Sequence, residues 1–328
     1  MIAVDSALDV RYVNFIGSKM LAIPRRNLLG KPFPATYEKA HEDLLTLCRA
    51  LLIRCQEHAS IQTDSIVIGD TTKIYYDLIA APKAQRNGAI IVIQDKTTHH
   101  KMVELGKDFV ANASHELRTP ITIIRGFAET LHDMPELPKD MIADITEKIV
   151  RNCQRMDSLV KSLLTLADIE NIPEDRFVPC DLIPLIENCR VVVRSVYADA
   201  AITIEKSQES IVIDADPDIL ELAFINLLDN GAKYSKGPAD IFVSITLKGD
   251  EVVITIRDKG IGIPEADLEN IFQRFYTVDK AHSRRLGGAG LGLSIVKTII
   301  DKHNGKISVT STLGKGTTFT IVLPVHRI

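Results

Sequence analysis

The sequence predicts a multidomain α+β chain: a small α/β domain first, a helical hairpin in the middle and a larger α/β domain at the end. The length of 328 residues is enough for two or three domains of roughly 100 to 200 residues each. The middle segment carries an apolar repeat of seven residues, whereas the flanking segments alternate short apolar strands with helices. We therefore expect domains over residues 1–96, 97–170 and 171–328.

Composition is that of a globular chain, with 45% hydrophobic and 25% charged residues. A net charge of -4 without a block of lysines and arginines disfavours nucleic acid and anionic membranes as partners. No apolar run approaches the roughly 20 residues of a membrane span, and the start lacks the pattern of a secretion signal. The five cysteines form no C-x-x-C and no Cys/His ligand spacing. We expect free thiols, no membrane span and a cytoplasmic location.

Residues 8–95 predict strands around small helices. The expected elements are a strand at Val10–Asn14, helices up to Gly30 and over 37–55, and strands at Ile66–Ile68, Lys73–Ala80 and Gly88–Gln94, with a turn at Arg86-Asn87-Gly88. The order resembles a PAS domain, notably from Tyr12 to Lys31. The resemblance implies a PAS-like sensor domain over residues 1–96, but no cysteine or histidine stands out as an attachment point for haem or flavin.

Two helices are expected over residues 97–132 and 138–170, separated by Pro135 and Pro138. Both carry an apolar stripe. The expected seam comprises Val103, Val110, Ala113, Leu117, Pro120, Ile124, Phe127 and Leu131 in the first helix, and Ile142, Ile145, Ile149, Met156, Val160, Leu163 and Ala167 in the second. One hairpin cannot bury both stripes by itself. We therefore expect a four-helix bundle made by a homodimer.

A histidine lies on the outer face of the first helix. With Val110 at heptad position a, His115 falls at f and faces solvent. Glu116 can accept the Nδ1 proton of His115, and Thr119 lies one turn away, where its hydroxyl can position a water. Pro120 removes a helical hydrogen bond and is expected to bend the helix there. A metalloprotease H-E-x-x-H motif is excluded, because position 119 is threonine.

The motif A-S-H-E-L-R-T-P, from Ala113 to Pro120, resembles the HisKA domain of sensor histidine kinases. The resemblance implies that His115 is phosphorylated, that Glu116 is the base and that Thr119 assists dephosphorylation. It also implies that residues 97–170 form the dimerisation and histidine phosphotransfer domain.

The last domain places polar residues on an otherwise apolar helix. Asp216-Pro217 is expected to begin this helix, and Asn226, Asn230 and Lys233 share one of its faces. An amide oxygen such as that of Asn230 can bind Mg²⁺ beside phosphates. By itself, this pattern also fits a solvated helix face.

A carboxylate ends an alternating strand. Period-two alternation from Val252 to Asp258 puts Asp258 on the apolar side of the strand, where it needs a donor. The 6-amino group of adenine is such a donor, whereas guanine has a carbonyl there. Gly260 and Gly262 allow the backbone to approach a base closely. The alternative is an ordinary turn aspartate.

Glycines from Gly287 to Leu293 open another helix, whose free N–H groups can meet phosphate. The spacing is neither that of a Rossmann fold nor that of a P-loop. The polar stretch from Val278 to Leu286, with Lys280, Arg284 and Arg285, suits a mobile lid or a merely solvated loop.

Five motifs in order, N-L-L-D-N-G-A-K-Y, D-K-G-I-G-I-P, F-Q-R-F-Y, G-G-A-G-L-G-L and G-K-G-T-T-F, resemble the boxes of the GHKL ATPase fold. The resemblance implies a Bergerat-type α/β sandwich over residues 171–328 that binds ATP, with Asn230 as the Mg²⁺ ligand and Asp258 on adenine. The other implied nucleotide-binding residues are Asn226, Lys233, Tyr234, Gly260, Gly262, Arg274, Gly288, Gly290, Leu291, Gly292 and Thr317. Three positions depart from the family pattern: Gly231, Thr277 and Ala289.

Together these features predict an ATP-dependent sensor histidine kinase. His115 would attack the γ-phosphoryl group and pass it to an aspartate in the receiver domain of a response regulator, and the same protein would act as its phosphatase. Two alternatives stay open: a GHKL-type ATPase that only hydrolyses ATP, and a non-catalytic scaffold.

Overall fold

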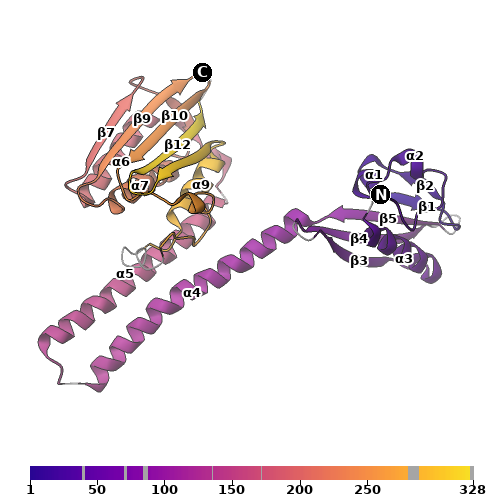
Figure 1. Ribbon diagram of the computed structural model, residues 1–328, viewed down its shortest axis with the longest axis horizontal. Coiled ribbons are helices and arrows are strands. Elements are labelled where there is room, and N and C mark those ends of the chain that lie inside the picture. The colour runs from indigo at the N-terminus through magenta and orange to yellow at the C-terminus, as the bar shows by residue number, and fades with distance from the viewer. Residues whose placement is uncertain are drawn as a thin grey trace. The chain divides into compact units, whose positions relative to one another are not determined.

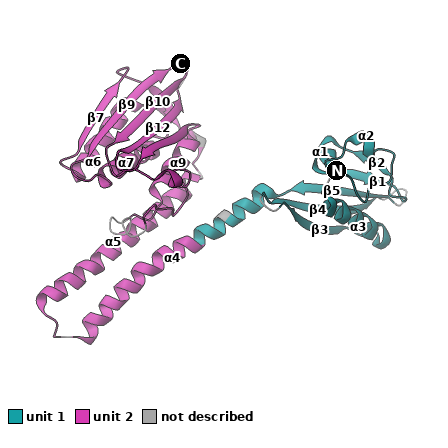
Figure 2. Ribbon diagram, viewed as in Figure 1, with its two compact units in different colours: residues 1–110 teal, residues 111–328 magenta. Residues whose placement is uncertain are grey.

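A computed structural model describes residues 1–38, 41–69, 72–83, 88–134, 136–170, 172–279 and 288–325. The chain divides into two compact units, residues 1–110 and 111–328 (Figure 2). The predicted turn at 86–87, Pro135 and the stretch 280–287 lie outside the described residues.

The first unit is built on a five-stranded antiparallel sheet in the order β2-β1-β5-β4-β3, and helices α1 to α3 connect β2 to β3 (Figure 1). The bounds are β1 Ile2–Val4, β2 Val10–Val13, α1 Phe15–Met20, α2 Arg25–Leu28, α3 Glu42–His58, β3 Gln62–Ile68, β4 Ile74–Lys83 and β5 Gly88–Asp95. The predicted α+β unit is present, with β1 as an additional strand. Three residues are too few for β1 to show a period in the sequence.

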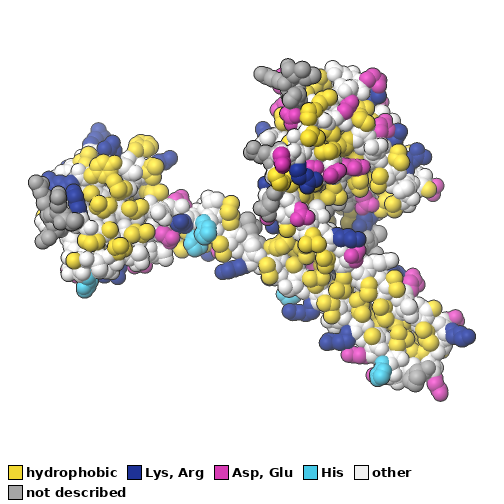
Figure 3. Space-filling view, turned by 180° about the vertical axis from the view of Figure 1, so that it is seen from behind, with side chains coloured by type: hydrophobic (Ala, Val, Ile, Leu, Met, Phe, Trp, Pro, Cys, Tyr) yellow, Lys and Arg dark blue, Asp and Glu magenta, His cyan; other side chains and the backbone are white. Residues whose placement is uncertain are grey.

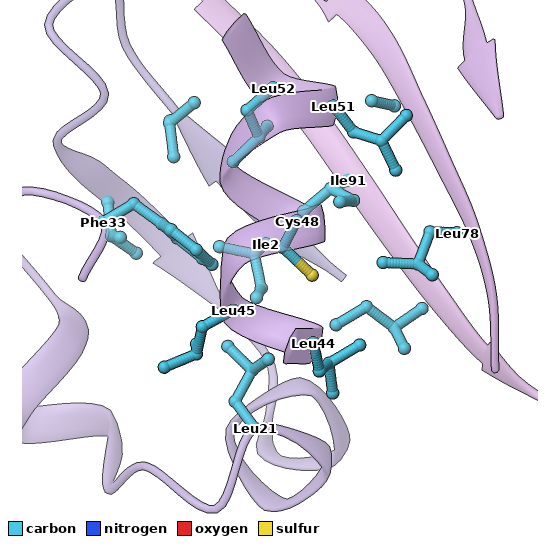
Figure 4. Packing of buried hydrophobic residues seen from close by; sticks show 14 of the residues in the cluster. Ile2, Leu21, Phe33, Leu44, Leu45, Cys48, Leu51, Leu52, Leu78 and Ile91 are labelled. Carbon is cyan, nitrogen blue, oxygen red and sulfur yellow. The ribbon is translucent and has the colours of Figure 1, made fainter. Parts of the chain in front are cut away.

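One face of α3 supplies much of the core of this unit. Leu44, Cys48, Leu51 and Cys55 recur every three or four residues, so they share the face that packs against the sheet. Figure 4 shows the first three of them. All four side chains are buried, and burial raises the pKa of the Cys48 thiol to about 12. All five cysteines of the chain are free thiols, as expected.

The long helix α4, Thr97–Asp133, begins directly after β5 and is anchored to the neighbouring strand at Tyr75. The Tyr75 N–H donates to Oγ1 of Thr97 (3.0 Å), and the Lys96 N–H donates to the Tyr75 carbonyl (2.8 Å). The Tyr75 ring stacks on His100, with 4.4 Å between centroids. The first turn of α4 is therefore tied to the sheet.

The helical hairpin consists of α4 and α5, Lys139–Glu170, and matches the predicted ranges to within one residue. Six predicted seam positions of α4 are buried or half-buried: Ala113, Leu117, Pro120, Ile124, Phe127 and Leu131. In α5 the predicted Val160 and Ala167 are exposed, and their neighbours Leu159 and Leu166 are buried. Steps of three and four from Met156 lead to these leucines, so within the single chain the buried positions at the end of α5 lie one residue before the predicted ones.

The last part of the chain is an α/β sandwich. Its sheet has the order β11-β12-β10-β9-β7, and α7 packs between α6 and α9 and against β9 and β10 (Figure 1). The bounds are α6 Leu182–Val196, β7 Ala201–Lys206, α7 Pro217–Lys233, β9 Asp240–Lys248, β10 Glu251–Asp258, α9 Gly292–Lys302, β11 Lys306–Thr312 and β12 Gly316–Pro324. A short pair, β6 Val178–Asp181 with β8 Val212–Ala215, was not predicted, because each strand has only four residues.

A buried cluster fixes the start of α7. Asp216 caps the helix as predicted: its Oδ1 accepts from the N–H groups of Asp218 (3.2 Å) and Ile219 (3.5 Å). The Asp216 N–H donates to Nε2 of His303, whose Nδ1 lies 2.8 Å from the Ile299 carbonyl. Burial lowers the pKa of His303, which favours the neutral imidazole that this pattern requires. Arg176 adds a charge contact, 2.7 Å from its Nε to Asp216 Oδ2.

We predict that Asp216→Ala lowers the free energy of unfolding by about 2 kcal/mol, because α7 loses its cap and Arg176 loses its counter-charge. Asp216→Asn keeps an acceptor for the helix and should cost about half as much. Urea unfolding followed by circular dichroism measures both variants. Equal losses for the two variants would show that the charge, not the cap, stabilises this junction.

Candidate functional site

A cavity of about 290 Å³ opens beside α7, between the segment after β10 and the segment before α9. It collects most of the residues that the sequence motifs single out. Its lining includes Asn226, Asn230, Lys233, Tyr234, Asp258, Gly262, Gly288, Gly290, Leu291, Gly292 and Thr317. Of the predicted nucleotide-binding residues, Gly260 and Arg274 do not line it.

The polar face of α7 forms one wall. Asn226 donates from Nδ2 to the Leu222 carbonyl (2.8 Å), which directs its Oδ1 toward Gly292, where a Cβ would lie 3.1 Å from that oxygen. Asn230 makes no side-chain hydrogen bond within the described residues, so its amide is available to a ligand. Burial lowers the pKa of Lys233, and the nearby Asp229 carboxylate opposes this shift. The wall thus offers amides and one half-buried ammonium.

Asp258 presents one carboxylate oxygen to the cavity. Its Oδ1 accepts from the N–H groups of Gly260 (2.8 Å) and Thr317 (3.2 Å), whereas Oδ2 has no hydrogen-bond partner among the residues that the structure describes. Burial raises the pKa of Asp258, and backbone donors, those of Gly260 and Thr317 first, oppose that shift. Val252, Ile254 and Ile256 are buried on the same side of β10, as the alternation predicts. An acceptor is therefore held at the edge of an apolar core.

Two glycines leave room for close contacts around the site. A Cβ on Gly260 would lie 2.8 Å from Asp258 Oδ1, so Gly260 leaves room for the carboxylate that its N–H binds. Gly290 has a φ of +71°, and a Cβ there would lie 2.6 Å from the Tyr276 carbonyl. The segment before α9 can therefore pass close to the backbone at Phe275 and Tyr276.

Arg274 lies at the end of α5 instead of in the cavity. Its guanidinium pairs with the carboxylate of Glu170 at 2.5 Å. The sequence motif places Arg274 near the nucleotide, but the carboxylate at the end of α5 supplies its counter-charge here. Such a pairing joins residues 104 positions apart and has no local sequence signal.

Several lining residues were missed by sequence reasoning. Asp229 lies between the two asparagines on α7, and its Oδ1 accepts from the Tyr197 hydroxyl (3.0 Å). That contact and burial, the larger cause, raise the pKa of Tyr197 to about 12. The helical spacing of Asp229 from Asn226 could have indicated it. Ser158, Leu159 and Ser162 of α5 also line the cavity, and only the tertiary structure reveals them.

The histidine on α4 lies apart from this cavity. His115 is exposed, as its heptad position predicts, and Thr119 donates from Oγ1 to the His115 carbonyl (3.3 Å). Glu116 does not bind the His115 ring: its carboxylate pairs with Arg155 of α5 at 2.8 Å, with side chains 31% and 12% exposed. None of His115, Glu116 and Thr119 lines the cavity.

The predicted lid cations, Lys280, Arg284 and Arg285, lie outside the described residues, whereas Thr277, Val278 and Ala289 line the cavity.

Among the described residues, no cluster of three or more histidine, cysteine, aspartate or glutamate side chains could hold a metal ion. Of the helices that the structure describes, none combines the length and the apolar composition needed to cross a bilayer.

Two domain families match this chain. Residues 107–172 match the His Kinase A (phospho-acceptor) domain, and residues 215–327 match the histidine kinase-, DNA gyrase B-, and HSP90-like ATPase domain. The sensor protein SrrB of Staphylococcus aureus (strain N315) is 34% identical over 256 residues, which are 77% of this chain and 43% of SrrB. The chain therefore spans less than half the length of this relative.

Solved structures share the fold. The histidine kinase ThkA, in complex with the response regulator protein TrrA, aligns with a TM-score of 0.58 and 21% identity over 99% of this chain and 95% of ThkA. The Acinetobacter baumannii histidine kinase AdeS aligns with a TM-score of 0.50 and 23% identity over 65% of this chain and 98% of AdeS. With a phospho-acceptor domain around His115 and an ATPase domain around the cavity, the chain belongs to the sensor histidine kinase family.

Proposed function

We propose that this chain is an ATP-dependent histidine autokinase that phosphorylates His115 and passes the phosphoryl group to a response regulator. The observation that carries the proposal is the joint placement of Asn230, Asp258 and the glycine segment in one cavity, in a chain whose phospho-acceptor helix exposes His115. Residues 1–96 would form the sensor domain, 97–170 the dimerisation and phosphotransfer domain, and 171–328 the catalytic domain.

Asp258 supports selectivity for adenine. Because Oδ1 already accepts two backbone N–H groups, Oδ2 is the acceptor left for a ligand. The 6-amino group of adenine donates to such an oxygen, and the carbonyl of guanine would leave two acceptors facing each other.

Asn230 fits the role of a Mg²⁺ ligand, because its amide faces the cavity and makes no other side-chain hydrogen bond within the described residues. Mg²⁺ takes few protein oxygens when phosphates supply the others, so one amide is enough. When bound, Mg²⁺ neutralises negative charge on the phosphates. Lys233, from the same face of α7, adds a positive charge to the cavity wall.

In the reaction, Nε2 of His115 forms a bond to the γ-phosphorus, and the bond from that phosphorus to the bridging oxygen breaks, so that ADP leaves. The Nδ1 proton is stabilised by a neighbouring carboxylate, and Glu116 is that group in this proposal. Since Glu116 pairs with Arg155, it must first exchange this partner. His115 must also approach a nucleotide in the cavity of its own or its partner chain, because it does not line the cavity.

The phosphoryl group would then pass to an aspartate of a receiver domain. The family supports this step, as does the solved complex of ThkA with the response regulator TrrA. Thr119 lies one turn from His115 and would position the water for a phosphatase activity.

The first unit would serve as a PAS-like sensor, which its five-stranded sheet and helices support. ATP use and free thiols favour a cytoplasmic location for the reaction.

Apolar side chains left exposed on the hairpin support a homodimer. Figure 3 shows hydrophobic side chains gathered along the two helices. The exposed large hydrophobic residues of α4 and α5 are Met102, Val103, Val110, Ile121, Ile123, Met141, Ile142, Val150, Val160 and Leu164. A second hairpin packed against this surface would complete a four-helix bundle.

We predict that the purified chain incubated with Mg²⁺ and γ-labelled ATP acquires an acid-labile, base-stable label that His115→Ala abolishes. Nucleotide affinity should be unchanged in His115→Ala, because His115 does not line the cavity. Label on the native chain and equilibrium binding of ADP are measured in parallel. ATP turnover without label would favour the plain ATPase, and binding with neither turnover nor label would favour the scaffold.

We predict that Asp258→Asn weakens ATP binding at least ~10-fold, because an amide N–H₂ would face the adenine amine. The same change should raise the melting temperature of the ligand-free chain at pH 7. Burial raises the pKa of Asp258. Above that pKa the buried carboxylate is ionised and destabilises the folded state, whereas below it the carboxyl group is neutral and this cost is absent. Calorimetry should show the gain at pH 7 and its loss near pH 4. A variant that binds ATP normally would contradict the assigned role.

We predict that the native chain is a dimer in solution and that Val110→Glu raises its dissociation constant at least ~10-fold. Val110 is 63% exposed in the single chain and takes heptad position a, where a bundle would bury the new charge. Thr122→Glu, at an exposed f position of the same helix, is the matched control. Light scattering over a concentration series measures both, and a monomeric native chain would contradict the bundle.

A further inference from the structure

The nucleotide cavity has a wall that comes from the dimerisation helix. Ser158, Leu159 and Ser162 of α5 line the same cavity as Asn230 and Asp258. Ser162 lies four residues after Ser158 and three after Leu159, so the three residues form one patch on the helix. Leu159 is 3% exposed. None of the motifs that describe the ATPase domain includes these residues.

Contacts at the end of α5 hold this wall in place. The carboxylate of Glu170 pairs with Arg274 at 2.5 Å, and Nζ of Lys302 donates to the Glu170 carbonyl (2.8 Å). The helix also packs against α9, which starts at the glycine segment of the cavity. Leu166 and Ile169, one face of α5 farther along, are each 1% exposed. The last three turns of α5 therefore pack against the ATPase domain.

The contacts at the end of α5 favour the docking of the ATPase domain on this helix, but they can also break. The side chains of Arg274 and Glu170 are 37% and 49% exposed, and ion pairs of this exposure shift an equilibrium by only a few fold. A bound nucleotide that touches α5 adds to the same equilibrium, since a ligand stabilises the arrangement to which it makes more contacts.

Resting on the proposed ATP-binding function, we propose that Ser158, Leu159 and Ser162 of α5 are part of the nucleotide-binding site, and that the Glu170–Arg274 pair holds them there. Nucleotide binding and docking of the ATPase domain on α5 then stabilise each other by the same factor. Since His115 does not line the cavity, the docked arrangement binds nucleotide without phosphorylating His115. Release of α5 costs nucleotide contacts and frees the domain to reach the histidine.

The test compares Glu170→Gln with Asp168→Asn in the full-length chain. Both remove one negative charge from the end of α5, but Asp168 is exposed and makes no ion pair among the described residues. Binding of Mg·ADP is measured at equilibrium, and the rate of His115 labelling is measured at saturating ATP. Glu170→Gln should bind Mg·ADP about two- to five-fold more weakly and yet label His115 faster by a similar factor, whereas Asp168→Asn should match the native chain.

A second variant changes the wall itself. Ser162→Tyr puts a bulky side chain on the cavity surface and should weaken Mg·ADP binding at least five-fold, whereas Thr146→Tyr, at an exposed position nearer the start of α5, should not. Mere damage to the domain would lower affinity and labelling rate together.

The outcomes separate this inference from the function on which it rests. Native affinity in both Glu170→Gln and Ser162→Tyr would overturn the α5 wall and leave the kinase intact. A fall in both affinity and labelling rate in Glu170→Gln would overturn the docked, non-phosphorylating arrangement. A native chain that binds no Mg·ADP would overturn the inference and the proposed function together.

Discussion

The buried carboxylate of Asp216 is the contact on which the geometry of the ATPase domain depends. It caps α7, receives Arg176 from the segment after α5, and its backbone N–H donates to His303 at the end of α9. The polar face of α7 and the glycine segment that opens α9 form two walls of one cavity, so a single buried cluster sets their relative position. The neutral state of His303 belongs to this arrangement, because Nε2 must accept a hydrogen bond in an interior that disfavours charge.

The structure keeps the nucleotide cavity and the phospho-acceptor His115 in different places. The cavity gathers an acceptor, amides and a half-buried ammonium, whereas His115 is exposed on α4 and outside the lining. Phosphoryl transfer requires in-line approach within bonding reach, and positioning supplies most of its catalysis. In the proposed kinase, the rate of transfer would therefore depend on a movement that brings the cavity and His115 together. α5 is the element that touches both sites, through Arg155 on one side and Ser158 to Ser162 on the other.

Local patterns predicted those features that local physics decides. The heptad of α4 and the prolines after it predicted the hairpin to within one residue, and alternation along β10 put Asp258 at the edge of the apolar side. Sequence patterns did not predict the features that depend on residues far apart in the chain. These features are the pairing of Glu170 with Arg274, the α5 wall, and the burial of Leu159 instead of Val160 in the single chain. Gly260 illustrates an intermediate case, because its spacing indicated a close backbone approach, and the structure shows such an approach to the Asp258 carboxylate.

Two ion pairs on α5 engage residues that the family resemblance assigns to the reaction: Arg155 holds Glu116, and Glu170 holds Arg274. Each pair occupies a group that the transfer step would use, so each must open before that group can act. The Glu170–Arg274 pair, with side chains 49% and 37% exposed, shifts an equilibrium by only a few fold, whereas Arg155 is 12% exposed and its pair with Glu116 is the more buried of the two. α4 runs without interruption from the anchor at Tyr75 to the turn of the hairpin and carries His115 and Glu116 on the way. In the proposed sensor kinase, a rotation or shift of α4 would therefore act directly on the Glu116–Arg155 pair, because Glu116 lies on that helix and Arg155 on α5.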